Sequence, residues 1–243
     1  MGEGVNLRYL VNISYDGSAF YGSQKQKDKR TVLGEIEKVL SKVLNKPIKV
    51  VGCSRTDRGV HANEFYFHVD CDKNIDMHSL NKMLPEDIIV NSVKVVSDDF
   101  HARYSVISKE YKYIINTGDV DIFRRNYVYN YSKSINYMLL MNTLQKFLGE
   151  KDFKTFTSDN EKESTVRNIF ETRVERDDNL IIVYIRGNGF LKYMVRNIIG
   201  FALDVQEGKY KLEEVESIIN SKDRTKIGKA APGEGLYLNR VFY

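Results

Sequence analysis

Hydrophobic and polar residues alternate along several parts of this chain with the period of a half-buried β-strand. In the stretch 9–15 every second residue is Tyr, Val or Ile, and the run ends at the turn signal Asp16-Gly17. Similar alternating or β-branched runs cover 48–51, 65–69 and 88–96. The pattern therefore predicts four strands in the first part of the chain.

A period of about 3.6 residues marks two amphipathic helices between these strands. Thr31 is placed to cap the first, whose apolar residues form one stripe over 32–44 before Pro47. Asp76 is placed to cap a shorter helix that runs through Met83. The predicted order is β-α-β-β-α-β, the split βαβ pattern.

The second part of the chain repeats this pattern loosely, which predicts an α+β protein with two similar halves, 1–105 and 106–243. No Pro-, Gly- or Ser-rich linker separates the halves, so we expect them to join or pack closely around a cleft. The elements expected in the second half are strands at 111–115, 166–174, 180–185 and 236–242, and helices at 134–148, from about 190, and at 212–219.

The composition restricts the class of protein and its setting but does not indicate a function. The 243 residues are 42% hydrophobic, which is enough for a sizeable core, and the net charge of +4 tilts only mildly toward anionic partners. Two cysteines, no apparent secretory signal and no long apolar run predict a reducing, cytoplasmic setting without membrane insertion. Cys53, His61, His68 and Cys71 lie close in sequence but lack metal-ligand spacing, so no metal site is expected.

The most unusual connection is Arg55-Thr56-Asp57-Arg58, between two predicted strands. Flanking positive charge favours the ionised form of Asp57, which makes it an available carboxylate, as a nucleophile or charge stabiliser, and a poor general acid. The plainer alternative is that Asp57 caps a turn beside two solvated arginines.

Three further segments carry candidate binding chemistry. On the helix expected from Phe190 and Leu191, Lys192 and Arg196 lie one turn apart on the polar side, where an anion would relieve their repulsion. Aromatic residues beside cations in 100–113 suit base stacking, and cations in 25–30 suit phosphate. Both patterns are also compatible with ordinary surface and strand composition.

Taken together, these segments resemble the TruA-type tRNA pseudouridine synthase family through nearly the whole chain. One such tripeptide is weak support, whereas a series in the same order is strong. The matching motifs are Tyr15-Asp16-Gly17 with Tyr21-Gly22, Arg55-Thr56-Asp57, Gly59-Val60-His61-Ala62, Asp99-Phe100-His101-Ala102-Arg103, Ser164-Thr165-Val166-Arg167, Gly189-Phe190-Leu191, Met194-Val195-Arg196-Asn197 and Gly235-Leu236-Tyr237-Leu238.

The resemblance implies the α+β pseudouridine synthase fold, with two ferredoxin-like halves of the βαββαβ type, a largely antiparallel sheet and a central active-site cleft. It implies isomerisation of uridine at tRNA positions 38, 39 and 40, without metal or cofactor, by a homodimer that binds tRNA. Asp57 is similar to the family's nucleophile, Tyr111 to its active-site tyrosine and Arg196 to the partner of the aspartate. The residues implied to bind substrate are Lys25, Lys27, Arg55, Arg58, His61, His101, Arg103, Phe190 and Leu191.

Three positions depart from the family's usual pattern. Ser23 stands where tryptophan is usual, Ser54 where glycine is common, and Arg58 where a small residue is usual. Such changes leave open a paralogue with another RNA target.

A noncatalytic RNA-binding protein on the same scaffold is a separate alternative, and the retention of Asp57, Tyr111 and Arg196 together argues against it. A glycosidase ranks far behind, because no second carboxylate stands in an equally marked motif. Whether Asp57 attacks C1′, attacks C6 or assists elimination is also open.

Overall fold

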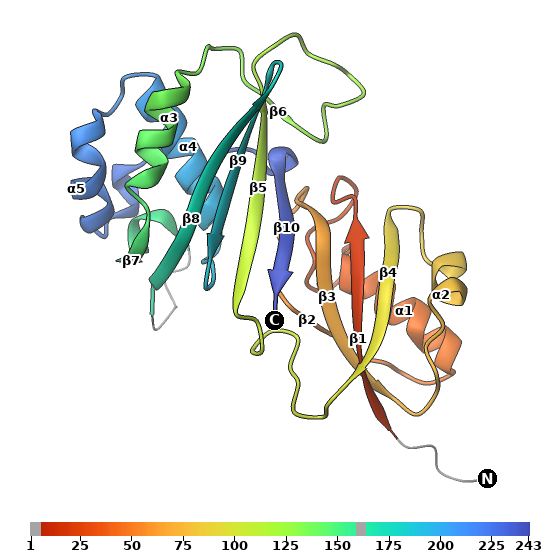
Figure 1. Cartoon of the computed structure of the whole chain (residues 1–243). Helices are drawn as coiled ribbons and strands as arrows, with labels where there is room; N and C mark the ends of the chain where they lie inside the picture. The colour runs from red at the N-terminus through yellow and green to blue at the C-terminus, as the bar shows by residue number, and fades with distance from the viewer. Residues whose placement is uncertain (1–5, 159–163) are drawn as a thin grey trace. The chain divides into compact units, whose positions relative to one another are not determined.

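The computed structural model describes residues 6–158 and 164–243, and the chain divides into two compact units. Unit 1 comprises Met1–Ile107 together with Tyr237–Tyr243, and unit 2 comprises Ser108–Leu236. Each unit combines helices with a mostly antiparallel sheet (Figure 1). The α+β class predicted from the sequence is confirmed.

The sheet of unit 1 has the strand order β4-β1-β3-β10, with β2 also paired to β3. The neighbours β4, β1, β3 and β2 are antiparallel, whereas β10 runs parallel to β3 with Tyr237 opposite His61. The strands are β1 (Leu7–Tyr15), β2 (Val51–Gly52), β3 (His61–Cys71), β4 (Ile88–Val96) and β10 (Leu236–Phe242). Phe65 and Phe67 on β3 lie in the core, at 0% and 1% exposed.

Two helices pack beside this sheet, α1 (Val32–Leu44) and α2 (Met77–Met83) (Figure 1). The predicted cap of α2 is confirmed, since Asp76 accepts a hydrogen bond from the Ser79 N–H at 2.8 Å. Thr31 is the N-cap residue of α1 as predicted, but its side chain makes no capping hydrogen bond. The first amides of α1 instead donate to backbone carbonyls of the preceding loop, which satisfies groups that every helix start leaves open.

The sheet of unit 2 has the strand order β5-β9-β8-β7, all antiparallel, with β6 parallel to β5. Its strands are β5 (Ser108–Asn116), β6 (Tyr129–Asn130), β7 (Gly149–Asp152), β8 (Val166–Asp177) and β9 (Leu180–Gly187). The sequence predicted β5, β8 and β9 but neither β6 nor β7. Strands of two and four residues are too short to show a period.

Unit 2 also contains the helices α3 (Tyr137–Gln145), α4 (Met194–Gln206) and α5 (Val215–Asn220) (Figure 1). Their core contains edge-to-face phenylalanines, with the rings of Phe147 and Phe156 5.0 Å apart. Short 3₁₀ helices cover Lys154–Phe156, Leu212–Glu214, Arg224–Lys226 and Gly233–Gly235. Within 6–158 and 164–243, no helix combines the length and apolar character needed to cross a membrane.

Several predicted boundaries were wrong. The strand expected at 48–51 is reduced to β2, and the helix expected at 134–148 is limited to α3, which Asn136 caps by accepting from the Leu139 N–H. The helix expected over 212–219 begins as a 3₁₀ turn before α5. Helix α4 begins at Met194 rather than near Phe190, because Tyr193 adopts a left-handed backbone with φ of 60°.

Candidate active site

Asp57 lies in the loop between β2 and β3, together with the candidate residues Arg55 and Arg58. Its side chain is half-buried, whereas those of Arg55 and Arg58 are exposed. The Val60 N–H donates to the Asp57 carbonyl at 3.3 Å, so the backbone turns back immediately after the aspartate. Gly59 supports this turn with a φ of +76°.

A second loop, residues 16–23, holds the Asp57 loop in place from the side. Thr56 exchanges two hydrogen bonds with Ser23: the Ser23 N–H donates to the Thr56 carbonyl at 3.2 Å, and the Thr56 N–H donates to Ser23 Oγ at 2.9 Å. The hydroxyls of Tyr15 and Thr56 lie 2.8 Å apart in a buried contact. The residue before Asp57 is therefore bonded through its backbone and through its side chain.

Two glycines allow the backbones of these loops to approach closely. A Cβ on Gly22, whose φ is +93°, would lie 2.5 Å from the Thr56 carbonyl oxygen. A Cβ on Gly17 would lie 2.0 Å from the carbonyl oxygen of Val60. The two contacts fall on either side of Asp57 in the sequence. The motif Asp16-Gly17 therefore serves packing between the loops in addition to the turn that the sequence predicted.

The Tyr21 ring lies close to two cations, Arg58 and Lys29. In the sequence, Tyr21 stood out only as part of the Tyr21-Gly22 motif. The guanidinium carbon of Arg58 lies 4.5 Å from the Tyr21 ring centroid, and Lys29 Nζ lies 4.6 Å from it. The residue is 38% exposed. A tyrosine within a cation-rich loop was the available signal, but its partner Arg58 is remote in sequence.

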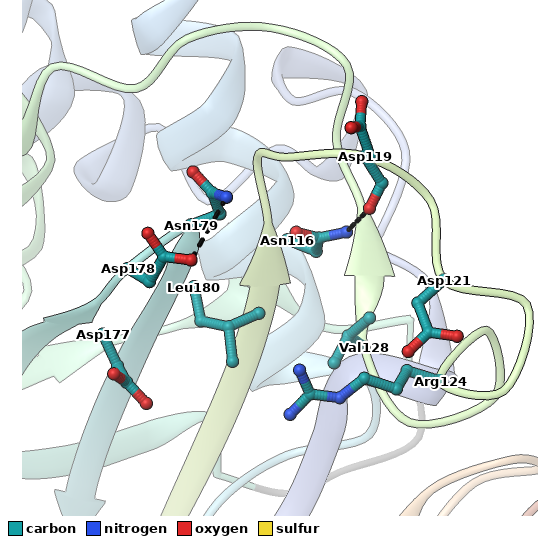
Figure 2. Close-up of a pocket in the computed structure, with 9 residues that line it drawn as sticks. All are labelled: Asn116, Asp119, Asp121, Arg124, Val128, Asp177, Asp178, Asn179 and Leu180. Atoms are coloured by element: carbon teal, nitrogen blue, oxygen red, sulfur yellow. Dashed lines mark hydrogen bonds between the residues drawn. The ribbon is translucent and has the colours of Figure 1, made fainter.

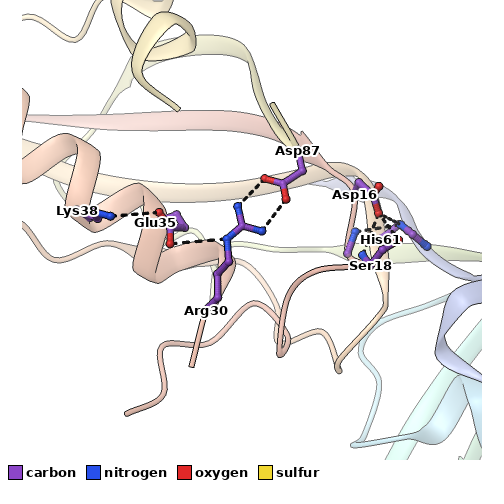
Figure 3. A network of polar contacts seen from close by, with 8 residues as sticks. Asp16, Ser18, Arg30, Glu35, Lys38, His61 and Asp87 are labelled. Atoms are coloured by element: carbon purple, nitrogen blue, oxygen red, sulfur yellow. Dashed lines mark hydrogen bonds and ion pairs between the residues drawn. The ribbon is translucent and has the colours of Figure 1, made fainter. Parts of the chain in front are cut away.

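His61 is buried, and its ring takes part in the fold of unit 1. Its Nδ1 accepts a hydrogen bond from the Gly17 N–H at 3.0 Å and lies 3.2 Å from Asp16 Oδ1 (Figure 3). The ring stacks on Tyr237 with centroids 4.6 Å apart, and the residue is only 2% exposed. Little surface is left on His61 for the substrate contact that the sequence suggested.

The segment that contains His101 and Arg103 is also held by histidine acceptors. His101 Nδ1 accepts from the backbone amides of Arg103 and Tyr104 at 3.1 and 3.2 Å, and its ring stacks on the 76%-exposed Tyr104. His68 Nδ1 accepts from the Ala102 N–H at 3.1 Å. Arg103 itself is exposed. Of this group, Arg103 and Tyr104 have the surface to meet a ligand.

We expect acid to weaken this segment through His68. Burial lowers the pKa of His68 below its ordinary value of 6.5, with the nearby charges of Arg8 and His101 acting in the same direction. The unfolded chain then binds a proton more readily than the folded one. The contribution of His68 to the stability of the fold is therefore fully present above about pH 6.5, and it is lost as the pH falls through the lower pKa of the folded state.

The measurement is an NMR titration of the His68 ring, with the urea-unfolded chain as reference. Melting temperatures between pH 7.5 and 5.5 give the linked stability, and His68→Gln should flatten that dependence because its amide does not titrate. A folded His68 pKa above the unfolded one would contradict the burial argument.

In unit 2, Tyr111 lies on β5 and packs against Phe190. Their rings meet edge to face with centroids 5.1 Å apart, Tyr111 is 6% exposed, and Phe190 is half-buried. Leu191, also 6% exposed, follows Phe190 in the sequence and precedes α4. Most of the surface of Tyr111 and of Leu191 is therefore buried.

Arg196, on the first turn of α4, is fixed to the chain near residue 231. Its Nε donates to the Ala231 carbonyl at 2.7 Å, and the Ala231 N–H donates to the Arg196 carbonyl at 2.9 Å. Its guanidinium lies 4.9 Å from the Tyr193 ring centroid. Lys192 was predicted to share a helical face with Arg196, which is wrong, because Lys192 precedes the helix and is exposed.

The candidate phosphate-binding lysines lie on the exposed loop before α1. Lys25 Nζ is 2.6 Å from the Glu37 carboxylate and the side chain remains 64% exposed. Lys27 is exposed as well. A surface pair of this kind is weak, so Lys25 can exchange its partner for another anion at little cost.

A cavity of about 290 Å³ lies in unit 2, where the turn after β5 meets the turn between β8 and β9, and none of the predicted site residues lines it (Figure 2). Four aspartates line it, Asp119, Asp121, Asp177 and Asp178, together with Arg124. Carboxylates repel phosphate, so this cavity does not suit a nucleic acid. The candidate site is therefore the loop around the half-buried Asp57 and the exposed Arg55 and Arg58, rather than this cavity.

Three comparisons place this chain among known proteins. The family model described as tRNA pseudouridine synthase matches residues 143–243. Proteins named tRNA pseudouridine synthase A are similar at 38% identity in Staphylococcus carnosus, 39% in Clostridium acetobutylicum and 40% in Malacoplasma penetrans, covering 97%, 96% and 98% of this chain and 91%, 98% and 100% of theirs.

Solved structures give a more distant likeness. An H/ACA ribonucleoprotein bound to a substrate RNA aligns with 96% of this chain and 46% of its own, at 13% identity and a TM-score of 0.36. This chain thus spans less than half of that protein, and the likeness supports no further argument.

Proposed function

This chain belongs to the tRNA pseudouridine synthase A family, and we propose that it converts uridine to pseudouridine in the anticodon stem-loop of tRNA, at positions 38, 39 and 40. The observation that carries this proposal is 38–40% identity to enzymes of that name over 96–98% of the chain. The activity is an isomerisation, with the same atoms in substrate and product.

The reaction breaks the bond from ribose C1′ to uracil N1 and forms a bond from C1′ to C5. The proton on C5 leaves and N1 gains one, so the reaction balances without an oxidant or a reductant. A base paired in a stem is inaccessible until it is flipped out, which costs about a few kcal/mol. We assign Asp57 as the nucleophile and Arg55 as the residue that supports the flipped nucleotide.

The held backbone of the Asp57 loop supports this assignment. Thr56 is bonded to Ser23, and the two glycine contacts of the 16–23 loop lie on either side of Asp57 in the sequence. Reaction with a positioned group is far faster than with a free one, because the entropy of orienting the group has already been lost when the protein folds. A carboxylate on a restrained turn meets that requirement, whereas a carboxylate that only caps a solvated turn does not need such restraint.

The RNA-binding surface proposed for unit 1 consists of Lys25, Lys27, Arg55, Arg58 and Tyr21. All are exposed, and Tyr21 is a ring on which a base can stack beside the Arg58 charge. Arg103, which is also exposed, is proposed as a further contact with RNA. The hydrogen bonds that His61 and His101 accept hold the backbone at Gly17 and at Arg103, respectively.

Tyr111 and Arg196 are proposed as the further catalytic residues, supplied by unit 2, with Phe190 and Leu191 as the apolar support for Tyr111. The edge-to-face contact of Phe190 with Tyr111 and the bond from Arg196 to Ala231 restrain both side chains. Tyr111→Phe keeps the ring, and Arg196→Lys keeps the charge but loses the planar fork. Undiminished turnover in either variant would remove that residue from the proposal.

The protein is proposed to act as a cytoplasmic homodimer. A net charge of +4 per chain gives a modest footprint for a polyanion, and pairing two chains doubles it. Sedimentation of the purified protein tests the dimer, and a single monomeric species at micromolar concentration contradicts it.

The test of function is release of tritium from tRNA that carries [5-³H]uridine. We expect the purified chain to release tritium without an added cofactor, because C5 loses its hydrogen when it bonds to C1′. A transcript with cytidine at positions 38, 39 and 40 is the matched control and should release none. Absence of release from the uridine-containing tRNA would refute the proposed function.

A different RNA target is the second candidate, favoured by the stacking of Arg58 on Tyr21 beside Asp57. Equal release from the control transcript and the uridine-containing transcript would favour it. Pseudouridine mapping in RNA from a deletion strain would then identify the target.

A further inference from the structure

Ser23 is buried within unit 1, although it lies in a loop and adjoins the exposed residue Gln24. The residue is 0% exposed. Tryptophan is usual here in the family that the sequence resembles, so the serine suggested a changed contact with RNA. A residue without exposed surface makes no such contact, and its effect must pass through its neighbours.

The neighbour of Ser23 that matters most is Thr56, directly before Asp57. Two hydrogen bonds join Ser23 and Thr56. The Ser23 N–H donates to the Thr56 carbonyl at 3.2 Å, and the Thr56 N–H donates to Ser23 Oγ at 2.9 Å. Both the donor and the acceptor of the Thr56 backbone are thereby engaged by one residue. The N–H belongs to the peptide group between Arg55 and Thr56, and the carbonyl to the one between Thr56 and Asp57, so Ser23 holds both peptide groups that lead into Asp57.

Ser23 is in turn attached to a helix. Its carbonyl accepts a hydrogen bond from the Leu33 N–H at 3.0 Å, and the Gly22 carbonyl accepts from the Val32 N–H at 3.3 Å. These amides begin α1, where helices leave donors open. A continuous path of hydrogen bonds therefore runs from α1 through Ser23 to Thr56, the residue that is covalently bonded to Asp57.

The side chain of Ser23 contributes the part of this path that a substitution can remove. Its Oγ is the acceptor for the Thr56 N–H, and that contact is buried. An unpaired buried amide is unfavourable. Loss of the acceptor would therefore make the peptide group between Arg55 and Thr56, which carries this N–H, turn toward another partner or water. Asp57 would shift with it.

We propose that Ser23 is a positioning residue for Asp57, acting through the backbone of Thr56. The inference rests on the proposed function, in which Asp57 reacts with uridine. It assigns to this serine a part in turnover rather than in RNA binding.

The experiment compares Ser23→Ala with a matched control, Ser41→Ala, in the tritium-release assay. Ser41 Oγ also accepts a backbone amide in unit 1, that of Ile48 at 2.9 Å, but belongs to α1 rather than to the Asp57 loop. We expect Ser23→Ala to lower kcat at least about 10-fold with KM and the Kd for tRNA within about 2-fold, since small misplacement of a reacting group is costly. Ser41→Ala should keep the wild-type kcat.

Ser23→Cys supplies a graded test, because it keeps the shape of the side chain but offers sulfur as a weaker acceptor. Its kcat should lie between those of the wild type and Ser23→Ala. Equal kcat values for Ser23→Ala and Ser41→Ala would overturn the proposal, as would a fall in tRNA affinity that accounts for the whole loss.

Hydrogen exchange in the wild-type protein decides the matter if Ser23→Ala does not fold. The Thr56 amide should exchange more slowly than its unstructured rate, and exchange at that rate would overturn the proposal. Failure of the proposed function is distinct, because it appears as absence of tritium release by the wild type.

Discussion

Asp57→Asn should reduce tritium release by at least about 1,000-fold while leaving the Kd for tRNA within about 2-fold. The substitution keeps the size of the side chain and removes its charge. An amide is a far weaker nucleophile than a carboxylate, and a factor of 1,000 corresponds to roughly 4 kcal/mol of barrier. Filter binding of the same tRNA separates lost chemistry from lost affinity.

The matched control for this variant is Asp28→Asn, in the exposed loop that follows Ser23. Asp28 has a φ of 56°, a conformation that asparagine tolerates, so the change removes one charge with little strain. Turnover by this variant should remain near that of the wild type. Equal activity of Asp57→Asn and Asp28→Asn would remove Asp57 from the chemistry.

Gly22→Ala should lower both the melting temperature and kcat, the latter by about 100-fold. A Cβ at this position would lie 2.5 Å from the Thr56 carbonyl oxygen, and that oxygen belongs to backbone rather than to a flexible side chain. One of the two loops must therefore move. Because Thr56 directly precedes Asp57, the displacement reaches the proposed nucleophile, and a shift of about 1 Å can cost a factor of 100 in rate.

Gly208→Ala separates the contact from the backbone strain. Gly208 also has a positive φ, +73°, but a Cβ there would meet nothing within 4 Å. Strain alone costs about 1–2 kcal/mol, or roughly 2–8 °C in a chain of this size. We expect Gly208→Ala to show only that loss, with unchanged kcat. Similar kcat values for the two variants would mean that the loops tolerate the added carbon.

Several elements were predictable because their signals are local. β4 matches its predicted range Ile88–Val96, and β10 matches Leu236–Phe242. The period of side-chain burial along a strand or helix depends on residues close in sequence, which is why these patterns survive in the fold. The cap of α2 by Asp76 depends on residues three apart and was predictable for the same reason.

Other predictions were wrong where the folded backbone departed from the preference of the residue type. Thr31 has the right residue type for a cap, but carbonyls of Gly22 and Ser23 accept the first amides of α1 instead. The start expected for α4 near Phe190 is displaced by the left-handed Tyr193. Propensity gives the preference of a residue in isolation, and neighbouring backbone can override it.

By itself, the sequence determined the α+β class, most of the strands and helices, and the family, because periods and ordered motifs are properties of the chain. Only the tertiary structure decided that Ser23 holds Thr56, that His61 is interior, and that Tyr21 stacks with Arg58. Each of these depends on residues more than 30 positions apart, on strands or loops that meet only after the sheet of unit 1 has formed. A pattern in sequence carries no information on such distances, whereas hydrogen bonding and packing in the folded chain fix them.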